Sequence, residues 1–199
     1  LTLAVSNVFL PGSKAQYVIG WRNIKSAEIS LRKVDLTSNL TFRDGQRDLS
    51  QWLDAIDGGS SVATWTRQLD SKGDYVPGSE QVEIDRELPP GAYLLEAKSG
   101  SGSARELVLV TDSAIVTRSS GRRSIAFVAD ARTGAPIANA KVRLWEQYWD
   151  NGRNRFTSWT KTTGADGMAE FELDIRRGSH QLFATAIAGD KQAMLQGYA

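Results

Sequence analysis

Short runs in which apolar and polar residues alternate make up most of this sequence. The clearest run spans residues 168–175, with one side formed by Ala169, Phe171, Leu173 and Ile175 and the other by Glu170, Glu172 and Asp174. A strand with one buried and one solvent-facing side has this period of two. Similar runs cover residues 16–21, 27–31, 62–66, 81–84, 92–97, 107–111, 124–127 and 141–144. The pattern predicts an all-β chain.

Turn-forming residues separate these runs. They are Pro11-Gly12, Pro77-Gly78, Pro89-Pro90-Gly91, Gly100-Ser101-Gly102, Thr133-Gly134 and Asp166-Gly167. The five prolines all fall between runs, where the missing N–H does not interrupt a strand ladder. Many short strands with regularly spaced turns are typical of antiparallel β-sandwiches, so we expect this architecture.

The strand series restarts once, which indicates two domains. A complete series ends at residues 106–110, and a new apolar run begins at Ala114. We therefore place a boundary at Thr111-Asp112, with one sandwich over residues 1–111 and a second over 112–199. Both lengths are near the roughly 100 residues of an immunoglobulin-like sandwich.

One stretch has a helical rather than a strand period. In residues 48–56 the apolar side chains recur at helical spacing, at Leu49, Trp52, Leu53 and Ile56. Asp48 is a suitable N-cap, and Gly58-Gly59 ends the pattern. We expect a short helix here, inserted into the first domain.

Composition excludes several kinds of site. The chain has 24 basic and 23 acidic side chains, so it lacks the overall positive charge typical of nucleic-acid binding. It has no cysteine, which rules out disulfides, thiolate nucleophiles and Cys-based metal sites. No run approaches the roughly 18 apolar residues of a membrane-spanning helix. The chain begins in an alternating run without Met, so we expect an excised piece whose targeting signal lies elsewhere.

No residue pattern points to catalysis. His180 is the only histidine, and neither a nucleophile elbow nor a zinc-binding helix accompanies it. The glycines of residues 100–103 precede a strand, whereas a phosphate-binding loop needs a following helix. The acidic residues do not have the spacing of a calcium-binding loop. We predict a chain that is not an enzyme and carries no cofactor.

A group of aromatic residues is the best candidate for a binding surface. Trp145, Tyr148, Trp149, Phe156 and Trp159 bracket a polar loop at residues 150–155 that contains Arg153 and Arg155. Aromatic and arginine side chains dominate the energetics of protein interfaces, so the predicted interaction patch comprises Trp145, Tyr148, Trp149, Arg153, Arg155 and Trp159. Two other interpretations stay open, namely packing within the domain and stacking on sugar rings. The basic turn formed by Arg118 with Arg122-Arg123 is expected to be solvated.

Several segments resemble a known protein family. Residues 107–116 read Leu-Val-Leu-Val-Thr-Asp-Ser-Ala-Ile-Val, and residues 126–142 contain Thr133-Gly134-Ala135-Pro136 followed by an Ala-Lys-Val run. Residues 162–171 add an Asp-Gly turn before an amphipathic strand, and residues 87–97 contribute Glu-Leu-Pro-Pro-Gly-Ala-Tyr. Together they resemble consecutive macroglobulin-like domains from the N-terminal half of bacterial alpha-2-macroglobulins. Each of these elements alone also occurs in other β-sandwiches. The resemblance is stronger because the Val-Thr-Asp junction occurs at the matching spacing from the Thr-Gly-x-Pro and Asp-Gly elements.

The resemblance implies seven-stranded, fibronectin-III-like sandwiches that serve as scaffold and docking surfaces. Members of the family trap proteases with a bait segment and, in many cases, a thioester. The cysteine-free chain cannot hold that thioester.

The implied role is non-catalytic, in protease inhibition or protein–protein interaction in the bacterial cell envelope. Its partners would be proteases, envelope proteins or neighbouring domains, with membrane contact only through an anchor outside this chain. The parent would be periplasmic, either a lipoprotein anchored in the inner membrane or a secreted protein. Tandem modules of an adhesin or surface stalk, and a carbohydrate-binding module, remain alternatives.

Overall fold

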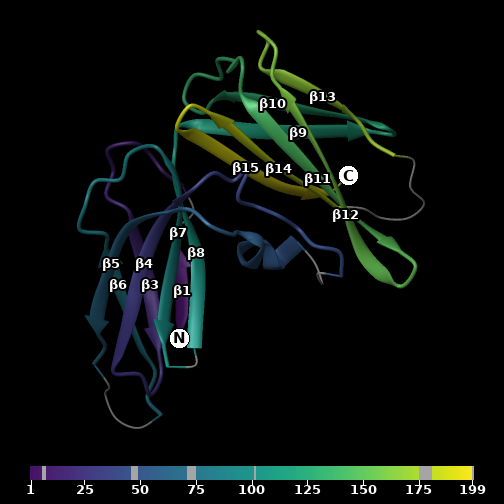
Figure 1. Cartoon of the computed structure of the whole chain (residues 1–199). Helices are drawn as coiled ribbons and strands as arrows, with labels where there is room; N and C mark the ends of the chain where they lie inside the picture. The colour runs from purple at the N-terminus through teal and green to yellow at the C-terminus, as the bar shows by residue number, and fades with distance from the viewer. Residues whose placement is uncertain (6–7, 46–48, 71–74, 101, 175–180, 199) are drawn as a thin grey trace. The chain divides into compact units, whose positions relative to one another are not determined.

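The computed structural model describes residues 1–5, 8–45, 49–70, 75–100, 102–174 and 181–198. The chain divides into two compact units (Figure 1). The first comprises Leu1–Val34 and Gly58–Thr111, and the second comprises Asp35–Asp57 and Asp112–Ala199. Strands make up most of both units, so the all-β prediction is confirmed.

The strands of the first unit form two sheets. The smaller is antiparallel, with the order β1 (Thr2–Val5), β3 (Gln16–Trp21), β6 (Gly78–Glu83). The larger has the order β2 (Val8–Phe9), β8 (Gly102–Val110), β7 (Gly91–Ser99), β4 (Ser26–Val34), β5 (Ser60–Gln68). In this sheet β2 runs parallel to β8, and the remaining pairs are antiparallel.

Alternation along these strands determines the core of the first unit. Ile29 and Leu31 of β4 are fully buried and belong to one cluster with Tyr93 of β7. Tyr17 and Ile19 of β3 contribute to the same cluster from the smaller sheet. Burying each such side chain is worth about 1.5–3 kcal/mol, so this cluster holds the two sheets together.

The second unit contains a seven-stranded sandwich. One antiparallel sheet has the order β13 (Met168–Glu172), β10 (Arg123–Asp130), β9 (Ser113–Ser120). The other has the order β12 (Arg153–Thr162), β11 (Lys141–Asp150), β14 (Gln181–Ala188), β15 (Lys191–Tyr198). Apart from β2, the first unit has the same topology, with the first, second and fifth strands in one sheet and the other four in the second. This arrangement confirms the prediction of immunoglobulin-like sandwiches.

The predicted helix differs from expectation in type and in position. Residues Leu49–Ala55 form 3₁₀ turns (η1), interrupted by non-helical dihedrals at Gln51. A run this short cannot offset the cost of nucleating an α-helix, so tight turns stabilised by packing replace it. The segment Asp35–Asp57 belongs to the second unit, although it connects β4 to β5 of the first. The predicted first domain, residues 1–111, includes this segment. Asp48, the proposed N-cap, lies outside the described residues.

The predicted loop at residues 150–155 is mostly strand. Strand β11 continues to Asp150 and β12 starts at Arg153, which leaves a two-residue turn of Asn151 and Gly152. Both turn residues have positive φ, 48° and 82°. Asn-Gly favours this turn because both residues tolerate positive φ, and the turn's twist matches that of the flanking strands. The aromatic residues therefore lie on a tight hairpin.

Candidate functional site

The six residues of the predicted patch lie on the β11–β12 hairpin but on both of its faces. Cross-strand pairs share a face, and the register pairs Tyr148 with Arg155 and Leu144 with Trp159. By the same alternation Arg153 lies on that face, while Trp145 and Trp149 lie on the opposite one. The structure therefore does not gather the six side chains into one surface.

Trp145 is part of the interior of the second unit. Its side chain is only 2% exposed, and its ring meets those of Phe42 and Phe183 edge-on, each at 5.8 Å between centroids. The guanidinium carbon of Arg143 lies 4.7 Å from the Trp145 ring centroid. Trp159 is partly buried and packs against the sandwich core from the other face. These two tryptophans have structural roles.

The accessible part of the predicted patch is the tip of the hairpin. Trp149 is 66% exposed, Arg153 is exposed and Tyr148 is half-buried. Arg155 is engaged by Asp44, whose carboxylate accepts a 2.5 Å bond from the Arg155 Nη1 atom. That hydrogen bond lowers the pKa of Asp44 and raises that of Arg155.

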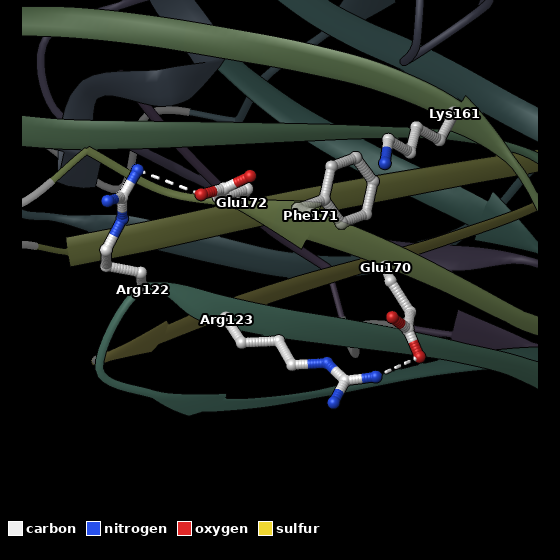
Figure 2. A pocket seen from close by; sticks show the side chains of 6 residues that line it. All are labelled: Arg122, Arg123, Lys161, Glu170, Phe171 and Glu172. Carbon is white, nitrogen blue, oxygen red and sulfur yellow. Dashed lines mark hydrogen bonds and ion pairs between the residues drawn. The ribbon is translucent and has the colours of Figure 1, made fainter.

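The basic turn lines a shallow hollow beside β13 (Figure 2). Its volume is 340 Å³, and Figure 2 shows Arg122 directed toward Glu172 and Arg123 toward Glu170. These ion pairs measure 2.9 and 2.5 Å. The Nζ atom of Lys161 lies 5.9 Å from the ring centroid of Phe171. Since both arginines are paired with carboxylates, their charges are largely neutralised and the hollow has little preference for an anion.

The first unit contains a buried carboxylate with two cationic partners. The Glu96 side chain is 5% exposed and lies 2.8 Å from both Arg105 Nε and Lys98 Nζ. Burial alone would raise its pKa, but hydrogen bonds from Lys98 and Arg105 outweigh that effect and lower it. Glu96 is therefore ionised near neutral pH with both oxygens engaged. A general acid would need the opposite shift, so we assign this group to stability.

Within the described residues, no cluster of three or more His, Cys, Asp and Glu side chains is arranged to hold a metal ion. His180 lies outside the described part of the chain, and the structure says nothing of its position. No helix in the described segments is long and apolar enough to cross a membrane.

Sequence reasoning missed the partners that bury Trp145. Phe42 and Phe183 come from segments about 100 residues before and about 40 after it, and nothing in their local pattern indicates a shared cluster. One available signal was overlooked, because Asn151-Gly152 between alternating runs is a strong hairpin signature. That signature would have turned the predicted polar loop into two strands.

The comparisons with known proteins concern both the sequence and the fold. No family model matches the chain. A curated relative, the alpha-2-macroglobulin of Ralstonia nicotianae, is 33% identical over 84 residues, which cover 42% of this chain and 5% of the relative. The resemblance noted in the sequence is therefore matched by a curated protein. Over this stretch the chain is similar to a bacterial alpha-2-macroglobulin.

Solved structures of this family have the same fold. A crystal structure of native Escherichia coli alpha-2-macroglobulin spanning domains MG0-NIE-MG1 matches with a TM-score of 0.57 and 16% identity, over 98% of this chain and 62% of that one. A second, spanning domains NIE-MG1, matches with a TM-score of 0.53 and 15% identity. That match covers 98% of this chain and 95% of the E. coli fragment. The matched stretch spans 5% of the length of the Ralstonia relative, and the chain has a fold similar to that of the two-domain E. coli fragment.

Proposed function

We propose that this chain is a non-catalytic scaffold segment of an alpha-2-macroglobulin-like protease inhibitor of the bacterial cell envelope. The observation that carries the proposal is the match of 98% of the chain to the fold of the E. coli NIE-MG1 fragment. Such a segment would hold other parts of the protein in place and present docking surfaces. We place the protein in the periplasm, with proteases, envelope proteins and neighbouring domains as its partners.

Protease inhibition by the whole protein and by this chain alone provides the test. We expect the whole protein to reduce cleavage of a large protein substrate while sparing a small chromogenic peptide, because trapping blocks access rather than chemistry. We expect the isolated chain to change neither reaction. Inhibition by the isolated chain, or incorporation of methylamine into it, would contradict a purely structural role.

The tip of the β11–β12 hairpin is the contact surface that we propose for a protein partner. Trp149 and Arg153 are exposed there, and a two-residue turn fixes the tip. Trp and Arg side chains bury much apolar area and form directional bonds on binding, so they often dominate an interface. A tight turn also reduces the ordering entropy that binding must overcome.

A photo-crosslinking amino acid at Trp149 in the whole protein tests this surface. We expect cross-links to a protein, with fewer from the same group at Val116, which is 60% exposed in β9. Equal yields from the two positions would remove the proposal. Selective retention on a glycan array, lost on Trp149→Ala, would instead support carbohydrate binding.

A further inference from the structure

The four-stranded sheet of the second unit has buried side chains on both faces. Val142 and Leu144 of β11 point into the sandwich core. Trp145, on the opposite face, is as deeply buried as they are, and its cross-strand partner Phe183 is fully buried. A sheet face that borders water is normally polar, so this outer face must have a cover.

The cover comes from the chain between β4 and β5. Its described residues, 35–45 and 49–57, belong to the second unit, and we call them the strap. Phe42 of the strap is 8% exposed, and its ring stacks on Phe156 at 5.1 Å and meets Phe183 edge-on at 5.6 Å. Trp52 of η1 also contacts Phe183, with 5.7 Å between centroids. Such aromatic pairs each add about 0.5–1.5 kcal/mol to the effect of burial.

The sheet also binds the strap backbone through buried polar groups. Leu36 donates its N–H to Gln192 Oε1 at 2.9 Å and accepts a bond from Thr185 Oγ1 at 3.4 Å. Arg143 Nη1 donates to the carbonyl oxygens of Thr37 at 3.1 Å and Leu40 at 3.4 Å. A buried backbone group without a partner is costly, so these side chains give the strap a defined register.

The strap is also fastened along the edge of β12. Asp44 binds Arg155 and accepts the N–H of Phe156 at 3.2 Å, and Gly45 donates its N–H to the Asn154 carbonyl at 2.9 Å. Within the strap, Leu40 and Ile56 form an antiparallel bridge. The contact between strap and sheet thus combines apolar rings, backbone hydrogen bonds and one ion pair.

We propose that the outer face of the β12-β11-β14-β15 sheet is a segment-binding surface whose occupant is the strap, and that the second sandwich needs this occupant for its full stability. The recognised chemistry is a segment of turns with large apolar side chains and backbone groups that need hydrogen-bond partners. The occupant is covalently part of a loop of the first sandwich. Cutting the chain at Thr111-Asp112 would therefore separate the second sandwich from its own ligand.

Hydrogen–deuterium exchange on the full chain tests the proposal with two matched variants. Phe42→Ala removes the central strap ring, and Phe9→Ala makes the same change at a residue of similar burial, 9% exposed, in the core of the first sandwich. We expect Phe42→Ala to speed exchange in β11 and β14 by at least about tenfold while β3 and β7 stay within about threefold of the wild type. Phe9→Ala should give the reverse pattern.

Two outcomes would overturn the proposal. One is faster exchange in the first sandwich, with β11 and β14 unchanged, in the Phe42→Ala chain. The other is the same uniform increase over both sandwiches in both variants. If Phe42→Ala prevents folding, Asp44→Ala replaces it, since Asp44 is half exposed and the change removes its side-chain bonds to Arg155 and Phe156 at the edge. Amide exchange in this variant should increase at residues 154–157. Unchanged exchange there would also refute the proposal.

Discussion

Gly167 and Gly134 share a φ of +73° but have very different surroundings. An added Cβ at Gly167 would lie 2.6 Å from the Val128 carbonyl oxygen and 2.9 Å from the Pro136 Cβ. At Gly134 no heavy atom lies within 4 Å of the added Cβ. Both glycines belong to the second unit, so replacing each by alanine separates steric packing from backbone strain in one domain.

The structure sets the size of the two effects. A left-handed backbone conformation costs about 1 kcal/mol for an L-residue, so we expect this loss in Gly134→Ala. Gly167→Ala adds an overpacking cost of about 1–3 kcal/mol. The 2.9 Å bond from the Val128 N–H to the Gly167 carbonyl is also disturbed, at about 1 kcal/mol. The free energy of unfolding should therefore fall about 2–4 kcal/mol further in Gly167→Ala than in Gly134→Ala.

Urea unfolding followed by tryptophan fluorescence measures this difference, because ΔG falls linearly with denaturant. Asparagine at both positions is a useful control, since it tolerates positive φ but still carries a Cβ. It should be nearly neutral at Gly134 and costly at Gly167. Equal losses at the two positions, for either replacement, would refute the packing around Gly167.

Three further changes test other parts of the structure. Because the pKa of Glu96 is lowered in the folded state, its contribution to stability is complete above the ordinary value of 4.5 and is lost as pH falls through the lower folded value. Glu96→Gln should therefore flatten the acid side of the profile of unfolding free energy against pH. Parallel profiles for the variant and the wild type would contradict this. Trp145→Ala should lower the free energy of unfolding by about 3–5 kcal/mol, whereas Trp149→Ala should change it by less than about 0.5 kcal/mol. Equal effects of these two changes would mean that the strap does not cover Trp145. Asn151→Ala should destabilise the hairpin by about 1 kcal/mol because residue 151 has a positive φ, and Asn151→Gly should be nearly neutral. Thermal unfolding tests this, and an Asn151→Ala midpoint no lower than that of Asn151→Gly would contradict it.

Local patterns predicted most of the strands. At residues 168–172 the buried and exposed side chains alternate as expected, although β13 ends at Glu172 and Ile175 lies outside the described residues. The Asp166-Gly167 turn is also present, but β13 pairs with β10 rather than with β12, so the turn joins two sheets instead of forming a hairpin. Strand partners depend on distant segments, which a local pattern does not specify.

The candidate binding surface was predictable only in part. The sequence identified the β11–β12 region as rich in aromatic and arginine residues. It did not separate Arg155, which pairs with Asp44, from Arg153, which is exposed. That difference depends on a residue more than 100 positions away. The prediction of a loop at residues 150–155 also gives no strand face by which to distinguish the two arginines.

Alternation and turn chemistry act between neighbours in the chain, so the sequence by itself determined the strands, the sandwich class and the family resemblance. Only the tertiary structure decided which surfaces those strands expose. Trp145 and Trp149 lie on the same face of the same strand, yet one is 2% exposed and the other 66%. Phe42 covers the first and not the second, because a loop leaving β4 packs on the second unit. Which of two residues on the same strand face is covered depends on such distant contacts, and no local pattern encodes them.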